Sequence, residues 1–276
     1  MPVDPAVAVG AELPGRELHW DTTDVLLYHL AVGAGPGELS YVYEAALGGV
    51  LPTFATVATT LRDTEPPAVR MPGIDVDLAR VVHGRQELLL HGPIPPCGRV
   101  HASSRIVDVY DKGSAAVIVT ETSTELFTSR ISIFAKGEGG FGGDRGPSTR
   151  VPPPAREPDL EVLCPTDPRQ ALWYRLCGDR NPLHVDPAFA TAAGFTRPIL
   201  HGLCTYGIVA KAAVDAALDG DPDRLAGYRC RFAGVVFPGE TLRTRIWRED
   251  GHLLLTATVA DRDDAPALSD VLITTR

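Results

Sequence analysis

A carboxylate and an imidazole stand five residues apart in the segment 178–184, GDRNPLH, and this pair is the clearest sign of chemistry in the sequence. Gly178 favours the end of a helix and Pro182 prevents a helix from continuing, so we expect a bent loop here. On such a loop the side chains of Asp179 and His184 can converge on one water molecule. A carboxylate can accept a proton from water, and an imidazole can give or take one near neutral pH. The same residues also fit an ordinary turn whose histidine has no chemical role.

A second feature, the segment 197–202 (RPILHG), directly precedes a stretch at 203–218 that is apolar nearly all round. Such a stretch predicts a buried helix. Gly202 would then place its amide at the helix N-terminus, where free N–H groups and the helix dipole favour negative charge. That arrangement suits reactions that build charge on a carbonyl oxygen, as when water adds to an enoyl thioester. The alternative is that Gly202 only allows a tight turn before the helix.

A weak internal repeat relates the two halves of the chain at an offset of 146 residues. It superposes three apolar positions of two predicted short helices: Leu26 on Leu172, Tyr28 on Tyr174, and Leu30 on Leu176. The N-caps that we expect are Thr22 or Thr23 for the first helix, and Thr166 or Asp167 for the second.

Strand signals follow the helices in each half. The predicted strands are 79–90, 100–110, 115–121 and 125–135 in the first half, and 225–233, 241–248, 252–260 and 268–275 in the second. The connections 111–113 (DKG) and 249–251 (EDG) are typical of tight hairpins. This order predicts an α+β fold in which a curved antiparallel sheet wraps a long buried helix. In the first half that helix is expected at 40–49, followed by 51–54. The Gly- and Pro-rich segment 137–159 predicts a linker between the halves.

The segment 178–184, followed by Ala190 and then by 197–202, resembles the hydratase 2 signature of the MaoC-like hydratase/dehydratase family. The segment 78–86 (LARVVHGRQ) resembles the non-catalytic half of eukaryotic-type enoyl-CoA hydratase 2, so the similarity extends over the whole chain. The resemblance implies a double hot-dog: two fused folds, each a long helix wrapped by an antiparallel sheet. It also implies a non-catalytic half at 1–136 that shapes the acyl-CoA pocket, the linker at 137–159, and a catalytic half at 160–276.

The activity that the resemblance implies is that of an (R)-specific enoyl-CoA hydratase, a hydro-lyase. Asp179 and His184 would hold and activate the attacking water and handle the proton delivered to C2. Asn181 would help orient the site, and Gly202 would supply the oxyanion donor. Which of Asp179 and His184 is the base and which is the acid stays open, because such a pair can titrate as a unit.

Four further residues fall where relatives contact the acyl-CoA: His83, Gly84, Lys112 and Phe232. Each has a structural alternative. His83 could be a satisfied strand histidine, Gly84 a strand bulge, Lys112 a solvated turn residue and Phe232 simple core.

The repeat also bears on the number of active sites. It places Gly33 opposite Asp179, Gly35 opposite Asn181 and Glu38 opposite His184. The first half therefore lacks the pair, and we expect one active site per chain.

Rival functions share much of this pattern. A 3-hydroxyacyl-thioester dehydratase, acting on CoA or carrier-protein substrates in biosynthesis, would use every one of these catalytic residues in the reverse direction. A hot-dog binding module without turnover would not need Asp179, Asn181, His184 and Gly202 together. A hot-dog thioesterase would direct water at C1 rather than C3, and the GDxNPxH pattern does not resemble that group.

Composition sets the remaining expectations. The formal charge is −9 with no basic run, which argues against nucleic acid as a partner. No apolar run approaches the ~20 residues of a membrane span. Five cysteines without a CxxC, and an N-terminus that does not look like a secretory signal, predict reduced thiols in the cytoplasm. We expect no metal, because His184 and His201 lie far apart in the sequence and no HxxxH or Cys/His cluster occurs. We expect no cofactor, since CoA belongs to the substrate. Relatives suggest a homodimer, while a fused double hot-dog also allows a monomer.

Overall fold

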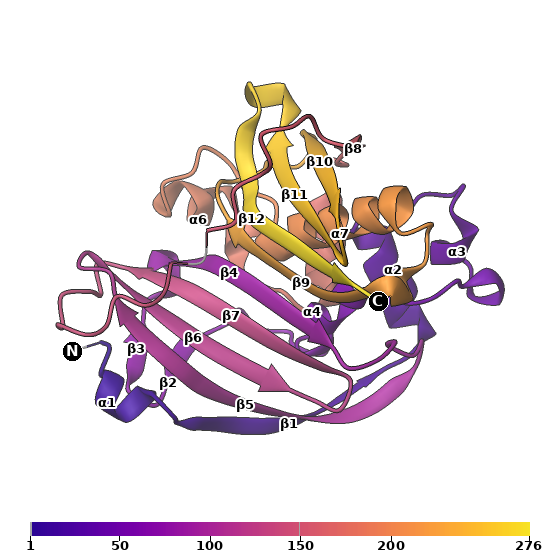
Figure 1. The fold of residues 1–276 in the computed structure, drawn as a ribbon. Coiled ribbons are helices and arrows are strands. Elements are labelled where there is room, and N and C mark those ends of the chain that lie inside the picture. The colour runs from indigo at the N-terminus through magenta and orange to yellow at the C-terminus, as the bar shows by residue number, and fades with distance from the viewer. Residues whose placement is uncertain (1, 149) are drawn as a thin grey trace.

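Ten strands form one antiparallel sheet in the order β1-β5-β6-β7-β4-β9-β12-β11-β10-β8 (Figure 1). The computed structural model describes residues 2–148 and 150–276. The first half supplies β1 (Glu12–Trp20), β4 (Val81–Leu90), β5 (Gly98–Asp111), β6 (Ala115–Ser123) and β7 (Phe127–Lys136). The second supplies β8 (Leu160–Pro165), β9 (Leu225–Phe232), β10 (Thr241–Glu249), β11 (His252–Val259) and β12 (Ala265–Thr275).

The strand order reads the same from either edge of the sheet. It is β1-β5-β6-β7-β4 from one side and β8-β10-β11-β12-β9 from the other. The halves meet at β4 and β9, which pair antiparallel from Arg85 opposite Arg231 to Leu89 opposite Gly227. The weak repeat in the sequence therefore reflects a structural repeat.

Helices cover the same sheet in both halves. They are α1 (Pro5–Ala8), α2 (Thr22–Ala31), α3 (Leu39–Val42), α4 (Ala55–Ala58), α5 (Gln170–Tyr174), α6 (Pro187–Ala192) and α7 (Gly202–Ala217), and a small sheet joins β2 (Val69–Met71) to β3 (Ile74–Val76). The helix predicted at 203–218 is confirmed as α7, which is buried along most of its length. No helix in the described part of the chain is both long and apolar enough to cross a bilayer.

The central helix of the first half is shorter than expected. The predicted stretch 40–54 forms α3, a 3-10 turn at Glu44–Ala46 and another at Pro52–Phe54 that leads into α4. Gly48, Gly49 and Pro52 explain the interruption, because glycine is a poor helix former and proline cannot continue a helix.

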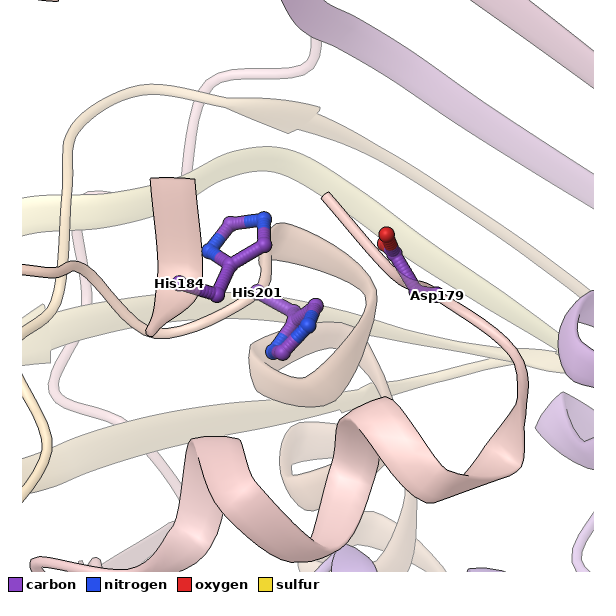
Figure 2. A group of neighbouring side chains, drawn as sticks. All are labelled: Asp179, His184 and His201. Carbon is purple, nitrogen blue, oxygen red and sulfur yellow. The ribbon is translucent and has the colours of Figure 1, made fainter. Parts of the chain in front are cut away.

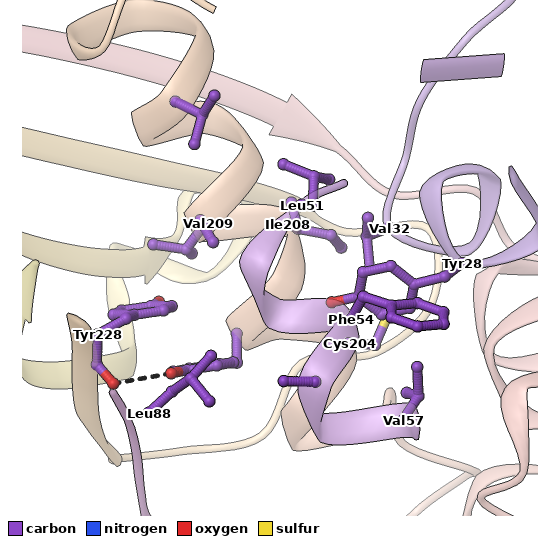
Figure 3. Close-up of a cluster of buried hydrophobic side chains, with 14 of the residues drawn as sticks. Tyr28, Val32, Leu51, Phe54, Val57, Leu88, Cys204, Ile208, Val209 and Tyr228 are labelled. Atoms are coloured by element: carbon purple, nitrogen blue, oxygen red, sulfur yellow. Dashed lines mark hydrogen bonds between the residues drawn. The ribbon is translucent and has the colours of Figure 1, made fainter. Parts of the chain in front are cut away.

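One hydrophobic core runs through both halves. Tyr28 of α2 and Tyr174 of α5, which the repeat superposes, are both fully buried with ring centroids 6.3 Å apart. Around them, Ile208 and Val209 of α7 pack with Phe54 of the first half (Figure 3). The halves therefore share one core and do not behave as separate domains in packing.

Two strands of the main sheet, the short strands β2 and β3, and both helix caps differ from the predictions. The strands β1 and β8 precede the helices of each half, where no strand was predicted. Both lie at sheet edges, and in β1 only Leu18 and Trp20 are buried, so the alternation that marks a strand is weak. The N-cap of α2 is Asp21, which forms a capping box with Asp24, rather than a threonine. For α5 the N-cap is Arg169, without a side-chain bond.

The linker segment has a defined path. Strand β7 ends at Lys136 and β8 begins at Leu160, and the described residues between them form no helix or strand. The carboxylate of Asp111 accepts hydrogen bonds from the amides of Gly140 (2.9 Å) and Gly142 (2.7 Å). The amide of Val151 donates to Asp270 in the second half (2.9 Å). The segment is thus attached to the sheet at both ends.

A glycine sets how closely the two halves pack. A Cβ on Gly207 of α7 would lie 2.6 Å from both the Tyr28 hydroxyl and Val32 Cγ1. We expect Gly207→Ala to lower the free energy of unfolding by about 1–3 kcal/mol from overpacking, less the ~1 kcal/mol that alanine gains in a helix. Chemical denaturation measures the difference. Gly37→Ala is the control, since nothing lies within 4 Å of its Cβ position; a stabilised Gly207→Ala would contradict the close packing.

Candidate active site

The loop that carries Asp179 begins at a glycine that no other residue could replace without strain. Helix α5 continues as a 3-10 turn, Arg175–Cys177, and ends at Gly178 with φ +110°. A Cβ on Gly178 would lie 1.9 Å from the carbonyl oxygen of Thr60 in the first half. Glycine is therefore required both for the backbone conformation and for the close approach of the first half.

Asp179 and His184, which we call the dyad, are positioned by short-range hydrogen bonds. Asp179 Oδ1 accepts from the amide of Asn181 (3.1 Å), and Asn181 Oδ1 accepts from the amide of Leu183 (3.0 Å). With Pro182 in the first position, Asn181 caps the 3-10 turn Pro182–His184 that presents the imidazole. Asn181 thus shapes the loop through its cap, and the loop is bent as predicted.

The imidazole of His184 is buried, with 8% of its surface exposed, and its tautomer is fixed. Nδ1 lies 2.9 Å from the carbonyl oxygen of Ile199. Because a carbonyl only accepts, Nδ1 must carry a proton, and in the neutral ring Nε2 is a free acceptor. Burial lowers the pKa of His184, and the charge of Asp179 together with the Ile199 carbonyl offsets only part of that effect. The ring is therefore neutral and basic at Nε2 near neutral pH.

A third side chain, that of His201, completes the cluster (Figure 2). Ligand atoms of Asp179, His184 and His201 lie within 4.8 Å of one another. The two imidazoles stack with centroids 3.7 Å apart and an interplanar angle of 29°. The argument against a metal from sequence separation was therefore wrong, since the fold brings these residues together. The stack itself disfavours a metal centre, because an ion in the plane of one ring lies outside the plane of the other.

Gly202 opens helix α7 beside this cluster, as predicted. His201 is the N-cap and Gly202 the first helical residue, a position whose N–H has no partner within the helix. A Cβ on Gly202 would lie 3.1 Å from the ring of Phe232. The Phe232 ring in turn lies 4.6 Å from the His83 ring, centroid to centroid. Two predicted substrate contacts therefore adjoin the predicted oxyanion donor.

The structure gives different surroundings to His83, Gly84 and Lys112, the residues predicted to contact substrate. His83 Nε2 meets the carbonyl of Arg85 at 2.9 Å, and burial lowers the pKa of His83 to about 4, so the ring is neutral. Gly84 lies at the register shift between β4 and β7, which agrees with its structural alternative as a bulge. Lys112 lies in the hairpin between β5 and β6 and donates to the carbonyl of Arg145. Two strands, β6 and β7, separate it from β4, so the structure does not bring it to His83.

The equivalent position in the first half holds no dyad. Gly33 follows α2 with φ +97°, as Gly178 follows the second helix, so the structural offset is one residue shorter here than in the helices. Ala34 rather than Gly33 then corresponds to Asp179. The nearby Glu38 accepts from the amide of Gly35 (2.7 Å) and pairs with Lys211 of α7.

The cavity beside that ion pair is separate from the cluster. It measures about 430 Å³ and is lined by Val32, Gly33, Cys164, Lys211 and Asp215 among others, and by none of the three cluster residues. This cavity is therefore not the site of Asp179 and His184.

From the sequence, His201 is considered only as a metal ligand and is given no role in the active site. It stands inside the segment 197–202, directly before Gly202, and that neighbourhood was the available signal. Its contact with His184 joins two loops that are 17 residues apart in numbering, which no local pattern reveals.

Known proteins resemble the chain over its whole length. A family model described as the MFE-2 hydratase 2 N-terminal domain matches residues 18–137, and the MaoC like domain matches residues 150–262. The enoyl-CoA hydratase ChsH3 of Mycobacterium tuberculosis is 52% identical over 282 residues, which cover 98% of this chain and 98% of that protein.

Solved structures also resemble the chain over its whole length. A MaoC-like dehydratase from Phytophthora capsici aligns with a TM-score of 0.90 and 29% identity, covering 99% of this chain and 98% of its own. A Mycobacterium tuberculosis protein with a double hot-dog fold aligns with a TM-score of 0.55 and 13% identity over 99% and 98% of the two chains, a likeness that concerns the fold alone. The predicted double hot-dog is confirmed, and the chain belongs to the MaoC-like hydratase/dehydratase family, with the two-part organisation of the hydratase 2 type.

Proposed function

We propose that the chain is an (R)-specific enoyl-CoA hydratase, which adds water reversibly to trans-2-enoyl-CoA to give (3R)-3-hydroxyacyl-CoA. The observation that carries this proposal is the cluster of a carboxylate, Asp179, and a neutral imidazole with a free Nε2, His184, beside the N-terminus of α7. The relative that is 52% identical is named as an enoyl-CoA hydratase, which supports the same substrate class and reaction.

The geometry suggests how the proton moves. Water lies between Asp179 and His184, and its oxygen attacks C3 of the enoyl thioester while Nε2 of His184 accepts one of its protons. The electron pair of the double bond moves onto the thioester oxygen, where the Gly202 amide donates a hydrogen bond to the enolate. His184 then returns the proton to C2, which restores the neutral ring. Asp179 holds the second hydrogen of the water and stabilises the transient imidazolium.

This assignment gives the base role to His184 in hydration. The reverse reaction, dehydration, runs through the same groups in the opposite order, and the Phytophthora relative is described as a dehydratase. The chemistry requires no resident cofactor, because CoA is part of the substrate.

Compartment and assembly are part of the same proposal. We place the chain in the cytoplasm, which agrees with five cysteines that form no disulfide. A homodimer completes the proposal, and light scattering tests it.

The dyad is tested by removing each group. We expect Asp179→Asn and His184→Gln each to lower kcat by ~10²–10⁴-fold, the usual contribution of a general acid or base. The two losses should not add in the double variant, because both groups serve one water. The assay follows the ultraviolet absorbance of the conjugated thioester with crotonyl-CoA and a longer trans-2-enoyl-CoA.

Two controls sharpen this test. Asp186→Asn makes the same chemical change at the exposed cap of α6, where asparagine also caps, and should keep full activity. Coupling the product to a stereospecific 3-hydroxyacyl-CoA dehydrogenase tests the 3R configuration. Wild-type turnover that survives in Asp179→Asn and His184→Gln would contradict the proposed site.

The pH profile reports the base. A base must be deprotonated, and the pKa of His184 is lowered below its ordinary value of about 6.5. The acid limb of kcat/KM should therefore have its midpoint below pH 6.5, because the rate falls as His184 becomes protonated. In Asp179→Asn the acid limb of the remaining activity should have its midpoint at a still lower pH, because the negative charge that raises the pKa of His184 is gone. An acid limb above pH 6.5 would argue that His184 is not the free-enzyme base.

The oxyanion donor has an unusually clean test, because proline is tolerated in the first turn of a helix yet has no N–H. His201, the preceding residue, has φ −56° and ψ 134°, the conformation that a following proline requires. We expect Gly202→Pro to turn over about 10²–10³-fold more slowly than Gly202→Ala. Both variants carry a Cβ against Phe232, so the ratio of their kcat values isolates the amide. Equal rates would remove Gly202 from the mechanism.

A further inference from the structure

His201 is a buried polar residue whose presence the dyad mechanism does not explain. Its side chain is 1% exposed, and among the described residues neither Nδ1 nor Nε2 has a hydrogen-bond partner of good geometry. Leaving a buried polar group unpaired costs about 1–3 kcal/mol. An apolar side chain of similar size would avoid that cost, so hydrogen bonding does not explain why an imidazole stands here.

His201 contacts the catalytic loop, the start of α7 and the core residue Tyr174. One face of its ring stacks on His184 at 3.7 Å, and its centroid lies 4.9 Å from that of Tyr174. As the N-cap of α7 it adjoins Gly202 in the chain. A single side chain therefore links the ring that takes the proton to the helix end that meets the enolate (Figure 2).

The ring of His201 is held neutral. Burial lowers its pKa well below the ordinary value, and the neighbouring His184 lowers it further. The backbone carbonyl of Asp179 offsets part of this effect, and Arg175 lowers the pKa by a smaller amount. The titratable groups beside His184 include Asp179 on its own loop and His201 at the N-cap of α7. His184 thus has a carboxylate near its edge and an uncharged aromatic face against its plane.

We propose that His201 is a positioning residue that holds the His184 imidazole in place and stabilises its cationic form during proton transfer. This inference rests on the proposed function, in which His184 gains a proton from water and returns it to C2. The neutral ring offers its π face to that transient cation, an attraction that is strongest where water is excluded. A charged ring in the same place would repel it.

The test replaces the ring while keeping its volume and burial. His201→Leu and His201→Met remove the π face, His201→Phe keeps it without nitrogens, and His201→Asn keeps hydrogen-bonding atoms without a ring. We expect the Leu and Met variants to lose roughly three- to thirtyfold in kcat, the range of a desolvated cation–π contact, with KM within about twofold. The Phe variant should recover most of the loss, and Asn should not.

Two readouts separate this role from simple packing. NMR titration of labelled histidine should show a lower pKa for His184 in the Leu variant than in the wild type or the Phe variant, because the cation has lost its partner. The free energy of unfolding of the Leu variant should be unchanged or higher, because an unpaired polar group has been removed. A structural residue would instead lower stability and leave the titration where it was.

Several outcomes would overturn the inference. The first is a His201→Leu variant whose His184 pKa and kcat equal those of the wild type. The second is a kcat that His201→Asn restores and His201→Phe does not. The third is wild-type activity that a chelator removes and zinc restores, which would make His201 a metal ligand. If the wild type shows no hydration at all, the proposed function fails. The titration of His184 then still decides whether His201 stabilises its cation.

Discussion

The hydrogen bond from His184 Nδ1 to the carbonyl of Ile199 is the contact on which the proposed chemistry depends. It fixes the tautomer, so that a buried ring offers a basic nitrogen and not a second N–H. The segment that carries this carbonyl is itself held, because the amide of Leu200 donates to the carbonyl of Val236 at 2.7 Å. Ile199, His201 and Gly202 then supply the tautomer-setting carbonyl, the stacking ring and the oxyanion amide within four residues. Any shift of this segment displaces all three together.

The first half contributes to the site without contributing a member of the dyad. The carbonyl of Thr60 meets Gly178 where a side chain would clash, and the carbonyl of Asp63 accepts from Arg180 Nε at 3.1 Å. These contacts clamp both sides of Asp179 in the chain. The shared core beneath them, with Tyr28 and Tyr174 facing each other, makes the clamp rigid because close-packed interiors transmit displacement. The first half has no dyad residue, yet its contacts are required to hold Asp179 in position.

The sequence reveals the repeated strands and the dyad loop, because each depends on local pattern. Alternating residues mark β10 and β11, and Gly178 with Pro182 marks the bend. It conceals features whose cause lies elsewhere in the fold. Strand β1 forms because β5 is beside it, although few of its own side chains are buried. The role of His201 depends on the His184 ring, which packs against it from another loop. The turn at Gly33 is offset by one residue from the position that the repeat predicts.

The regions that follow α2 in the first half and α5 in the second show how one fold can place charge for stability or for reaction. On the first-half side, Lys211 is buried and its two carboxylate neighbours, Glu38 and Asp215, raise its pKa against the effect of burial. Lys211 is paired with both carboxylates, so none of these three groups is poised to exchange a proton. On the second-half side, Asp179 faces a ring that burial keeps neutral. Because Nδ1 is bonded to the Ile199 carbonyl, Nε2 carries the basic lone pair. That lone pair is what allows the ring to take a proton from water.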